Sequence, residues 1–173
     1  MAIPTSIEGD LHVRGRVTSE TMTIPASTIT DAMVASNAAI AATKQEHRFV
    51  INYSQADGSD VVAAIVPVYV VHGTTATLIS VEVVCIDAPE GGDKTFTVDL
   101  KKCNVGSPAP ATVLTGVIAY AAATPDCTIK AGTFSSTSLA NDDTLVVAIA
   151  VSGSTGNQGQ GLIVTVTLDE DAS

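Results

Sequence analysis

The chain has 173 residues, of which 46% are hydrophobic, 15% are charged and only 3% are aromatic. This length is typical of one domain with an appendage, and the high apolar and low charged content exclude a disordered chain. Eight basic against 18 acidic side chains give a formal net charge of −10, and the densest basic spots are Arg14/Arg16 and Lys101/Lys102. A surface this acidic repels phosphate backbones, so we expect no nucleic-acid ligand.

No targeting or membrane signal is recognisable. The start, Met-Ala-Ile-Pro-Thr, lacks the basic residues and the apolar run of a signal peptide, and the most apolar segment, Val61–Val71, is shorter than the roughly 20 residues of a membrane-spanning helix. The three cysteines, Cys85, Cys103 and Cys127, are odd in number and show no CxxC spacing, so we expect buried free thiols. The sequence predicts a soluble protein, made in a reducing compartment, with no membrane partner.

Residues 1–26 contain a short strand-like segment. Apolar residues alternate here with basic ones: Leu11, Val13 and Val17 with His12, Arg14 and Arg16. Period-two alternation is typical of a strand, and a lone strand must pair with another part or another chain to satisfy its backbone groups. Two interpretations stay open, a frayed terminus or an arm that docks on a partner.

Residues 27–47 have the composition of one α-helix. Thr28 and Asp31 form a capping-box-like pattern, and the run that follows is rich in alanine and free of glycine and proline. A helix of roughly 18 residues is about 27 Å long. Its heptad-spaced stripe consists of Ile29, Met33, Ser36, Ile40, Thr43 and His47. This thin, half-polar stripe favours a tight bundle of identical helices slightly over the alternative, a helix that lies on its own β-domain.

Residues 48–173 predict strands and turns almost throughout. The predicted strands are Phe49–Tyr53, Val61–Val71, Ala76–Ile86, Lys94–Leu100, Thr112–Tyr120, Thr128–Ala131, Thr144–Val151 and Leu162–Leu168. Turn-forming clusters such as Asn141-Asp142-Asp143 separate them, and no convincing helix interrupts them. About eight strands divided by turns predict an antiparallel β-sandwich or barrel.

Two of these strands are apolar on both faces. Apolar and polar residues alternate in Ala76–Ile86 and Lys94–Leu100, as in strands with one wet face, but Val61–Val71 and Thr144–Val151 show no such alternation. Both faces of the latter two strands therefore need cover, and in a small sandwich another subunit is the simplest second cover. The scarcity of aromatic side chains makes assembly a natural source of further stability.

The sequence assembles no recognisable catalytic or metal-binding motif. His12, His47 and His72 lie in different zones with no second ligand at metal spacing, and the GxSxG motif is absent. Paired carboxylates such as Asp142/Asp143 lie in turns, where solvation explains them, and a surface calcium site is the minority alternative. We therefore predict no enzyme, no catalytic residue, no cofactor and no metal ligand.

The most glycine-rich stretch runs from Gly153 to Gly161. It lacks the Lys-Ser/Thr ending of a phosphate loop and precedes a strand, so we interpret it as a long hairpin loop. Asn157 and Gln158 in this loop could contact a partner or a glycan. This possibility supports the second functional hypothesis, a receptor- or carbohydrate-binding fibre tip; an enzyme or metal-binding jelly roll is a distant third.

The order of parts resembles proteins of tailed bacteriophages. Gly9-Asp-Leu-His-Val-Arg-Gly-Arg-Val resembles the G-D-L-x-V-x-G-x-V openings of phage fibre and head-surface proteins, and residues 30–47 look like the short helix that follows such openings. The segments Leu139–Val151 and Gly159–Leu168 are similar to the closing strands of phage jelly-roll decoration domains.

The resemblance implies a capsid decoration (cement) or head-fibre protein, commonly a homotrimer, made in the host cytoplasm and located on the virion surface. The expected fold is mainly β, an antiparallel jelly-roll-like β-sandwich (48–173) preceded by an extended N-terminal arm (1–26) and one α-helix (27–47). The arm would dock on the major capsid protein through Leu11, Val13, Arg14, Arg16 and Val17. The oligomer interface would consist of Ile29, Met33, Ser36, Ile40 and Thr43. A receptor-binding tail fibre usually has a longer shaft and a more aromatic tip, which favours decoration over adhesion.

Overall fold

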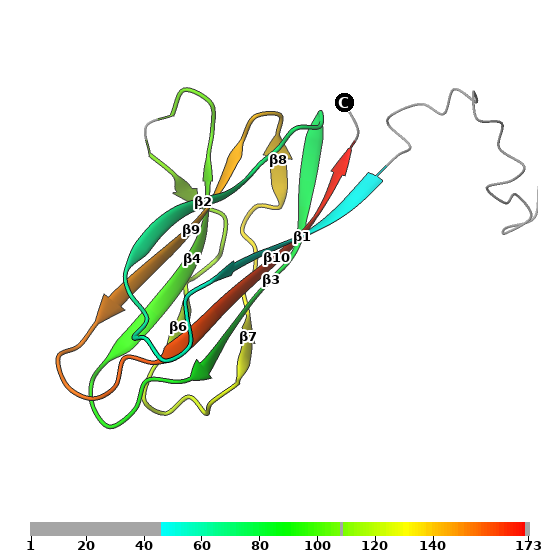
Figure 1. The fold of residues 1–173 in the computed structure, drawn as a ribbon. Coiled ribbons are helices and arrows are strands. Elements are labelled where there is room, and N and C mark those ends of the chain that lie inside the picture. The colour runs from blue at the N-terminus through cyan, green and yellow to red at the C-terminus, as the bar shows by residue number, and fades with distance from the viewer. Residues whose placement is uncertain (1–45, 108, 172–173) are drawn as a thin grey trace, which may run out of the picture. The chain divides into compact units, whose positions relative to one another are not determined.

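The structure is a computed structural model that describes residues 46–107 and 109–171. This part of the chain contains ten β-strands (Figure 1). The strands are β1 (Glu46–Ser54), β2 (Ala64–Val70), β3 (Thr75–Asp87), β4 (Thr95–Cys103), β5 (Ala111–Thr112), β6 (Ile118–Tyr120), β7 (Ile129–Ala131), β8 (Ser138–Ala140), β9 (Thr144–Ser152) and β10 (Gln160–Asp171).

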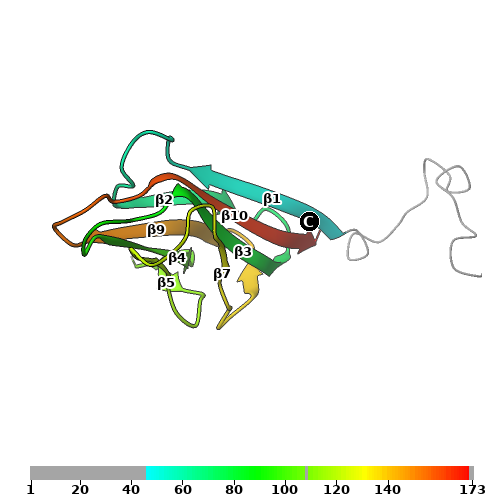
Figure 2. The ribbon, with the colours of Figure 1, turned by 90° about the horizontal axis from the view of Figure 1, so that it is seen from below.

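The strands form two sheets of five, and every strand pair is antiparallel. Sheet 1 has the order β1-β10-β3-β7, with β8 also paired to β3, and sheet 2 has the order β2-β9-β4-β5, with β6 also paired to β4. The two views of the ribbon show the sheets lying face to face (Figures 1 and 2). The predicted antiparallel β-sandwich is confirmed for the described residues.

The core fills the space between the sheets with aliphatic side chains that alternate along each long strand. On β3 and β4 the side chains of Val81, Val83, Phe96 and Val98 are buried, while that of Glu82 between the two valines is exposed, as the alternation in the sequence predicts. Strands β9 and β10 contribute Leu145, Val147, Ile149, Leu162, Val164, Val166 and Leu168. Each fully buried aliphatic side chain stabilises the fold by about 1.5–3 kcal/mol.

One stacked aromatic pair, both members of sheet 2, is fully buried in this core. The rings of Phe96 on β4 and Tyr120 on β6 stack with centroids 4.8 Å apart. The Tyr120 hydroxyl oxygen lies 2.6 Å from the carbonyl oxygens of Val83 and Thr128, and its single proton can be donated to one of them at a time. Burial of the phenol raises the pKa of Tyr120 to about 12. Tyr120 thus connects β6 of sheet 2 with β3 of sheet 1.

Seven of the eight predicted strands coincide with observed strands to within three residues at either end. The prediction of one strand over Thr112–Tyr120 is wrong, because the segment is divided between two short strands of sheet 2, β5 and β6, and the residues between them contact the segment that follows β7. The N–H of Val113 donates to the carbonyl of Leu100 in sheet 2, whereas the N–H of Thr115 donates to the carbonyl of Thr133, after β7 of sheet 1. The short strand β8 has no counterpart in the prediction, since three residues carry too little periodicity.

The boundary between the predicted helix and the sandwich also differs from the structure. Strand β1 begins at Glu46, so Glu46 and His47 belong to a strand and not to the end of a helix. Both residues pair with the end of β10, where His47 lies opposite Glu170. Pairing with a strand so distant in the sequence overrides the local helical composition. The rest of the predicted helix and the arm lie outside the described residues.

The cysteines are free thiols, as predicted, but only one of them is buried. Cys85 lies in the core, Cys103 is half-buried and Cys127 is exposed, so the expectation of three buried thiols is wrong. Burial raises the pKa of the Cys85 thiol to about 11. Cys127 lies in the connection between β6 and β7 with a φ of 54°, a left-handed turn conformation that keeps its side chain at the surface.

Candidate functional site

All of the residues predicted to form the arm and the oligomer interface fall within residues 1–45, outside the described part of the chain. The arm residues are Leu11, Val13, Arg14, Arg16 and Val17, and the interface residues are Ile29, Met33, Ser36, Ile40 and Thr43. Both assignments therefore stay predictions.

Within residues 46–107 and 109–171 no three His, Cys, Asp or Glu side chains come together in a way that could hold a metal ion. Nor does this part of the chain include a helix with the length and apolarity to cross a membrane. The carboxylate pair Asp142/Asp143 serves the turn before β9: the Oδ2 atom of Asp143 accepts the N–H of Ala140 at 2.8 Å and lies 3.6 Å from the Nζ atom of Lys102. Asp143 is buried and shapes this turn.

The glycine-rich segment Gly153–Gly161 is not a hairpin loop, because it connects β9 of sheet 2 with β10 of sheet 1. It is held against the connection between β3 and β4 by Asp93. The Oδ1 atom of Asp93 accepts the hydroxyl of Thr155 at 2.7 Å, the N–H of Ser154 at 2.9 Å and the N–H of Thr155 at 2.7 Å. These hydrogen bonds, that of the Thr155 side chain above all, lower the pKa of Asp93 to about 2.

The two amides considered as glycan contacts make hydrogen bonds within the molecule. Gln158 is buried, and its Nε2 atom donates to the carbonyl of Thr95 at 2.8 Å. The Nδ2 atom of Asn157 donates to the carboxylate of Glu90 at 3.2 Å. The segment is therefore braced by its own polar groups, and the buried amide of Gln158 is not presented to a ligand.

A buried carboxylate ties the sheets together at the end of the sandwich where β10 ends. The side chain of Glu170 accepts the hydroxyl of Tyr69 at 2.7 Å, the N–H of His72 at 3.1 Å and the N–H of Gly73. Burial, followed by the hydrogen bond to Glu170, raises the pKa of Tyr69 well above its usual value. The ring of Phe49 on β1 lies 5.7 Å from that of Tyr69, so this cluster links β1, β2 and β10. Its groups satisfy one another, which makes it a structural clamp.

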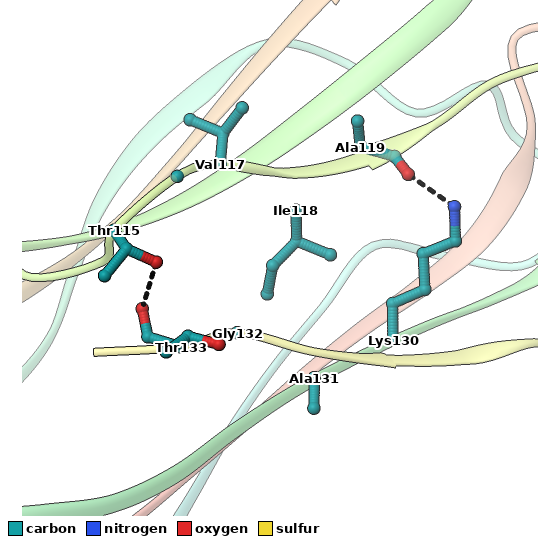
Figure 3. A pocket seen from close by; sticks show the side chains of 9 residues that line it. Thr115, Val117, Ile118, Ala119, Lys130, Ala131, Gly132 and Thr133 are labelled. Atoms are coloured by element: carbon teal, nitrogen blue, oxygen red, sulfur yellow. Dashed lines mark hydrogen bonds between the residues drawn. The ribbon is translucent and has the colours of Figure 1, made fainter. Parts of the chain in front are cut away.

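A groove of about 450 Å³ lies between the edge strands β6 and β7 (Figure 3). Lys130 reaches across it from β7, and its Nζ atom donates to the carbonyl of Ala119 at 2.6 Å and to Thr124 at 3.1 Å. The Nζ atom also lies 4.6 Å from the centre of the Tyr120 ring. The Lys130 ammonium group therefore closes the gap between the two sheet edges, and its hydrogen bonds are used within the molecule.

The outer face of sheet 2 is formed by side chains that point away from the core on β2, β9 and β4. The strand register places them in two neighbouring rows, Pro67–Val146–Lys101 and Ile65–Ala148–Asp99, followed by the pair Ala150–Thr97. A shallow groove of about 240 Å³ on this face has Ala148, Ala150, Ile65 and Val117 among its lining residues. Ile65 is 73% exposed and Val117 is 52% exposed.

The lining of that groove carries two formal charges, and they form an ion pair. The Nζ atom of Lys101 lies 3.8 Å from the Oδ2 atom of Asp99, and the other carboxylate oxygen of Asp99 accepts the hydroxyl of Thr112 at 2.6 Å. The face thus combines alanine, isoleucine and valine with a balanced ion pair. For a protein with a net charge of −10, such a neutral surface is unusual.

The outer face of sheet 1 is more polar and carries more negative charge. Arg48 on β1 forms two hydrogen bonds to Asp169 on β10, at 2.8 and 2.9 Å, and these lower the pKa of Asp169. The exposed carboxylate of Glu82 adds negative charge on β3. An apolar row, Ile163–Val84–Ile129, crosses the same face, and Ile129 is 65% exposed.

Sequence reasoning identified the strands of the sheet 2 face but not their outward residues. Val61–Val71 and Thr144–Val151 were predicted to need cover on both sides, and the structure places β2 and β9 next to each other, so their outward residues form one surface. Strand neighbours that are far apart in the sequence cannot be read from a single chain. The contribution of Val117 carried no sequence signal, since the segment around it was predicted to be a regular strand.

Comparisons with known proteins gave two similarities of note. No protein-family model matches the chain, and no curated protein matches it. The structure is similar to a chain of the capsid of Ralstonia phage GP4, with 15% sequence identity and a TM-score of 0.48 over 76% of this chain and 88% of the other. It is also similar to a chain of the cyanophage Pam1 capsid asymmetric unit, with 15% identity and a TM-score of 0.43 over 82% of this chain and 99% of the other.

Proposed function

We propose that this protein is a structural component of a bacteriophage virion that decorates and stabilises the capsid surface as a homo-oligomer. The observation that carries the proposal is the contrast between the two kinds of surface on the sandwich. The polar groups that could form a site, such as Glu170, Asp93 and Gln158, are engaged in bracing the fold. Apolar side chains such as Ile65 and Val117 are left exposed, which is typical of a protein that assembles.

We infer that the sandwich is a jelly roll. The first strand pairs with the last and the second with the second last. Inside these, β3 pairs with β7 and β4 with β6, so the pairs are nested. Without the short strands β5 and β8, the two sheets have the orders β1-β10-β3-β7 and β2-β9-β4-β6. Nested antiparallel pairs rolled into two four-stranded sheets are the topology of this fold. The strand order thus supports the architecture that the sequence resemblance implies.

The N-terminal residues complete the proposal. The arm residues Leu11, Val13, Arg14, Arg16 and Val17 contact the major capsid protein. The helical stripe Ile29, Met33, Ser36, Ile40 and Thr43 gathers copies of the chain, three in the simplest case, and one face of the β-domain adds to the contact. Each contact is weak alone, and attachment comes from their sum over the capsid lattice.

Particles that lack the protein test the proposed function. Virions from a gene-deletion strain should release their genome at a lower temperature than wild-type virions, and adding the purified protein should restore the resistance. Protein without residues 1–23 should keep the folded sandwich and fail to restore it. Unchanged particles after deletion of the gene, or full attachment of the truncated protein, would contradict the proposal.

The oligomer is tested separately by Ile40→Asp. A carboxylate in the predicted helical stripe should prevent the helices from packing and yield monomers in sedimentation velocity. An oligomer of unchanged size would mean that the helix packs elsewhere, for example on its own β-domain.

A further inference from the structure

We propose that the outer face of sheet 2 is the surface on which a second copy of this chain packs. The inference rests on the proposed homo-oligomer and deepens it, because it selects one of the two sheet faces. Both faces carry exposed apolar side chains, so apolar character alone does not distinguish them. Ile65 on β2 and Ile129 on β7 are each exposed isoleucines on the edge strand of a sheet.

Small side chains make the sheet 2 face suitable for close packing. Ala148 and Ala150 of the central strand line the groove together with the larger and strongly exposed side chains of Ile65 and Val117. Small side chains beside large exposed aliphatic groups allow side chains of a second molecule to interdigitate with this face. On sheet 1, the outward positions of the central strand β10 are instead occupied by Ile163 and by three polar residues, Thr165, Thr167 and Asp169.

Charge favours a second copy as the occupant. Two molecules that each carry a net charge of −10 repel one another unless their contact surfaces are close to neutral. On the sheet 2 face Asp99 is balanced by Lys101, and two such pairs can align with opposite signs facing. On sheet 1 the outward side chains include the carboxylates of Glu82, Asp169 and Asp171, and Arg48 pairs with Asp169. The described part of that face therefore carries excess negative charge, and two copies of it repel.

The size of the face shows that it acts together with another contact. Three strands of seven to nine residues cover roughly 15 Å by 25 Å, or about 400 Å², at the usual strand spacing and rise. A stable interface needs about 800 Å² from each partner. The sheet 2 face supplies about half of this area, and the 45 residues that precede β1 are long enough to supply the rest.

Matched substitutions in the full-length protein test the surface. Ile65→Asp introduces a charge on the sheet 2 face, and Ile129→Asp introduces the same charge at a similarly exposed isoleucine on sheet 1. Because both side chains are largely exposed, both variants should fold, which circular dichroism verifies. In sedimentation velocity at graded concentrations, Ile65→Asp should weaken self-association at least tenfold, and Ile129→Asp should leave it unchanged.

Three results would overturn the surface assignment. The first is that Ile65→Asp associates as strongly as the wild type. The second is that Ile129→Asp weakens association and Ile65→Asp does not. The third is that the wild type is a monomer in which hydroxyl-radical footprinting finds Ile65 protected. The last result would mean that residues 1–45 of the same chain cover the face. The thermal resistance of capsids distinguishes this inference from the proposed function. If Ile65→Asp loses association but the protein has no effect on capsid resistance, the surface assignment holds and the proposed function is wrong.

Discussion

The hydroxyl group of Tyr69 on β2 donates a 2.7 Å hydrogen bond to the buried carboxylate of Glu170 on β10, and this bond joins the two sheets at the end where β10 stops. The same carboxylate accepts the backbone N–H groups of His72 and Gly73. One side chain therefore fixes both a neighbouring strand and the turn that follows it.

Two substitutions that remove part or all of this clamp should destabilise the sandwich to different degrees. Tyr69→Phe should lower the free energy of unfolding by about 1–2 kcal/mol, because one hydrogen bond to a charged group is lost. Glu170→Ala should cost about 3 kcal/mol, since it also leaves two backbone N–H groups without their acceptor. Urea unfolding measures both values. The control is Tyr53→Phe, whose hydroxyl only accepts a bond from Gln55; an equal loss there would contradict the special role of Glu170.

Acid should release the bracing of the glycine-rich segment. The pKa of Asp93 is lowered to about 2, so its carboxylate stabilises the folded state above its ordinary pKa near 4, and this contribution disappears as the pH falls toward 2. The difference in melting temperature between the wild type and Asp93→Asn should be constant above about pH 5 and shrink between pH 4 and 2. A difference that does not change over this range would show that the charge of Asp93 is not what holds Ser154 and Thr155.

Alkali should act on the core itself through Tyr120. Burial raises the pKa of Tyr120 to about 12, so the stability gained from its neutral phenol is complete below pH 10 and declines as the pH rises toward 12. Tyr120→Phe should be less stable by about 1–2 kcal/mol at pH 7 and should lack this part of the alkaline decline. Chemical unfolding at pH 7, 9, 10 and 11 measures the effect. An alkaline decline of Tyr120→Phe equal to that of the wild type would show that the phenol of Tyr120 does not cause this effect.

Alanine substitutions at two glycines distinguish the stability cost of backbone strain from that of steric overlap. Gly58 and Gly156 both have positive φ, 77° and 89°, but a Cβ atom on Gly58 meets nothing within 4 Å, whereas one on Gly156 would overlap the carbonyl oxygen of Glu90. Gly58→Ala should cost about 1 kcal/mol from the left-handed conformation alone. Gly156→Ala should cost more than about 2 kcal/mol, since Glu90 or the segment must also move. Equal melting temperatures of the two variants would mean that this segment adapts freely.

The sequence predicted most of the long strands because their signals are local. Alternation in β3 and β4 follows from one buried and one wet face, and the turns around Gly58 and Asp142 contain residues that adopt positive φ. The wrong predictions arose where contacts between residues far apart in the sequence determine the local structure. The strand over Thr112–Tyr120 divides because Thr115 bonds to Thr133, and His47 joins a strand because it pairs with Glu170.

The candidate surface could be predicted only in part, because the apolarity of its strands is local but their pairing is not. Two strands apolar on both sides indicated that something must cover them, but only the register shows that Ile65 and Ala148 lie side by side on one face. The free thiols were predictable from the number and spacing of the cysteines. The exposure of Cys127 depends on the turn in which it lies, which the composition around it does not reveal.

The pairing of β1 with β10 has a mechanical consequence. Nine residue pairs run without interruption from Glu46 opposite Asp171 to Ser54 opposite Ile163. Tension between Glu46 and Asp171 would open this ladder like a zipper, one pair after another. Tension between Glu46 and the segment that enters β10 at Gln160, at the opposite end of the ladder, would instead load all nine pairs in shear, and they would have to break together. A sandwich held by its N-terminal residues and pulled from that far end is therefore loaded in its stronger direction.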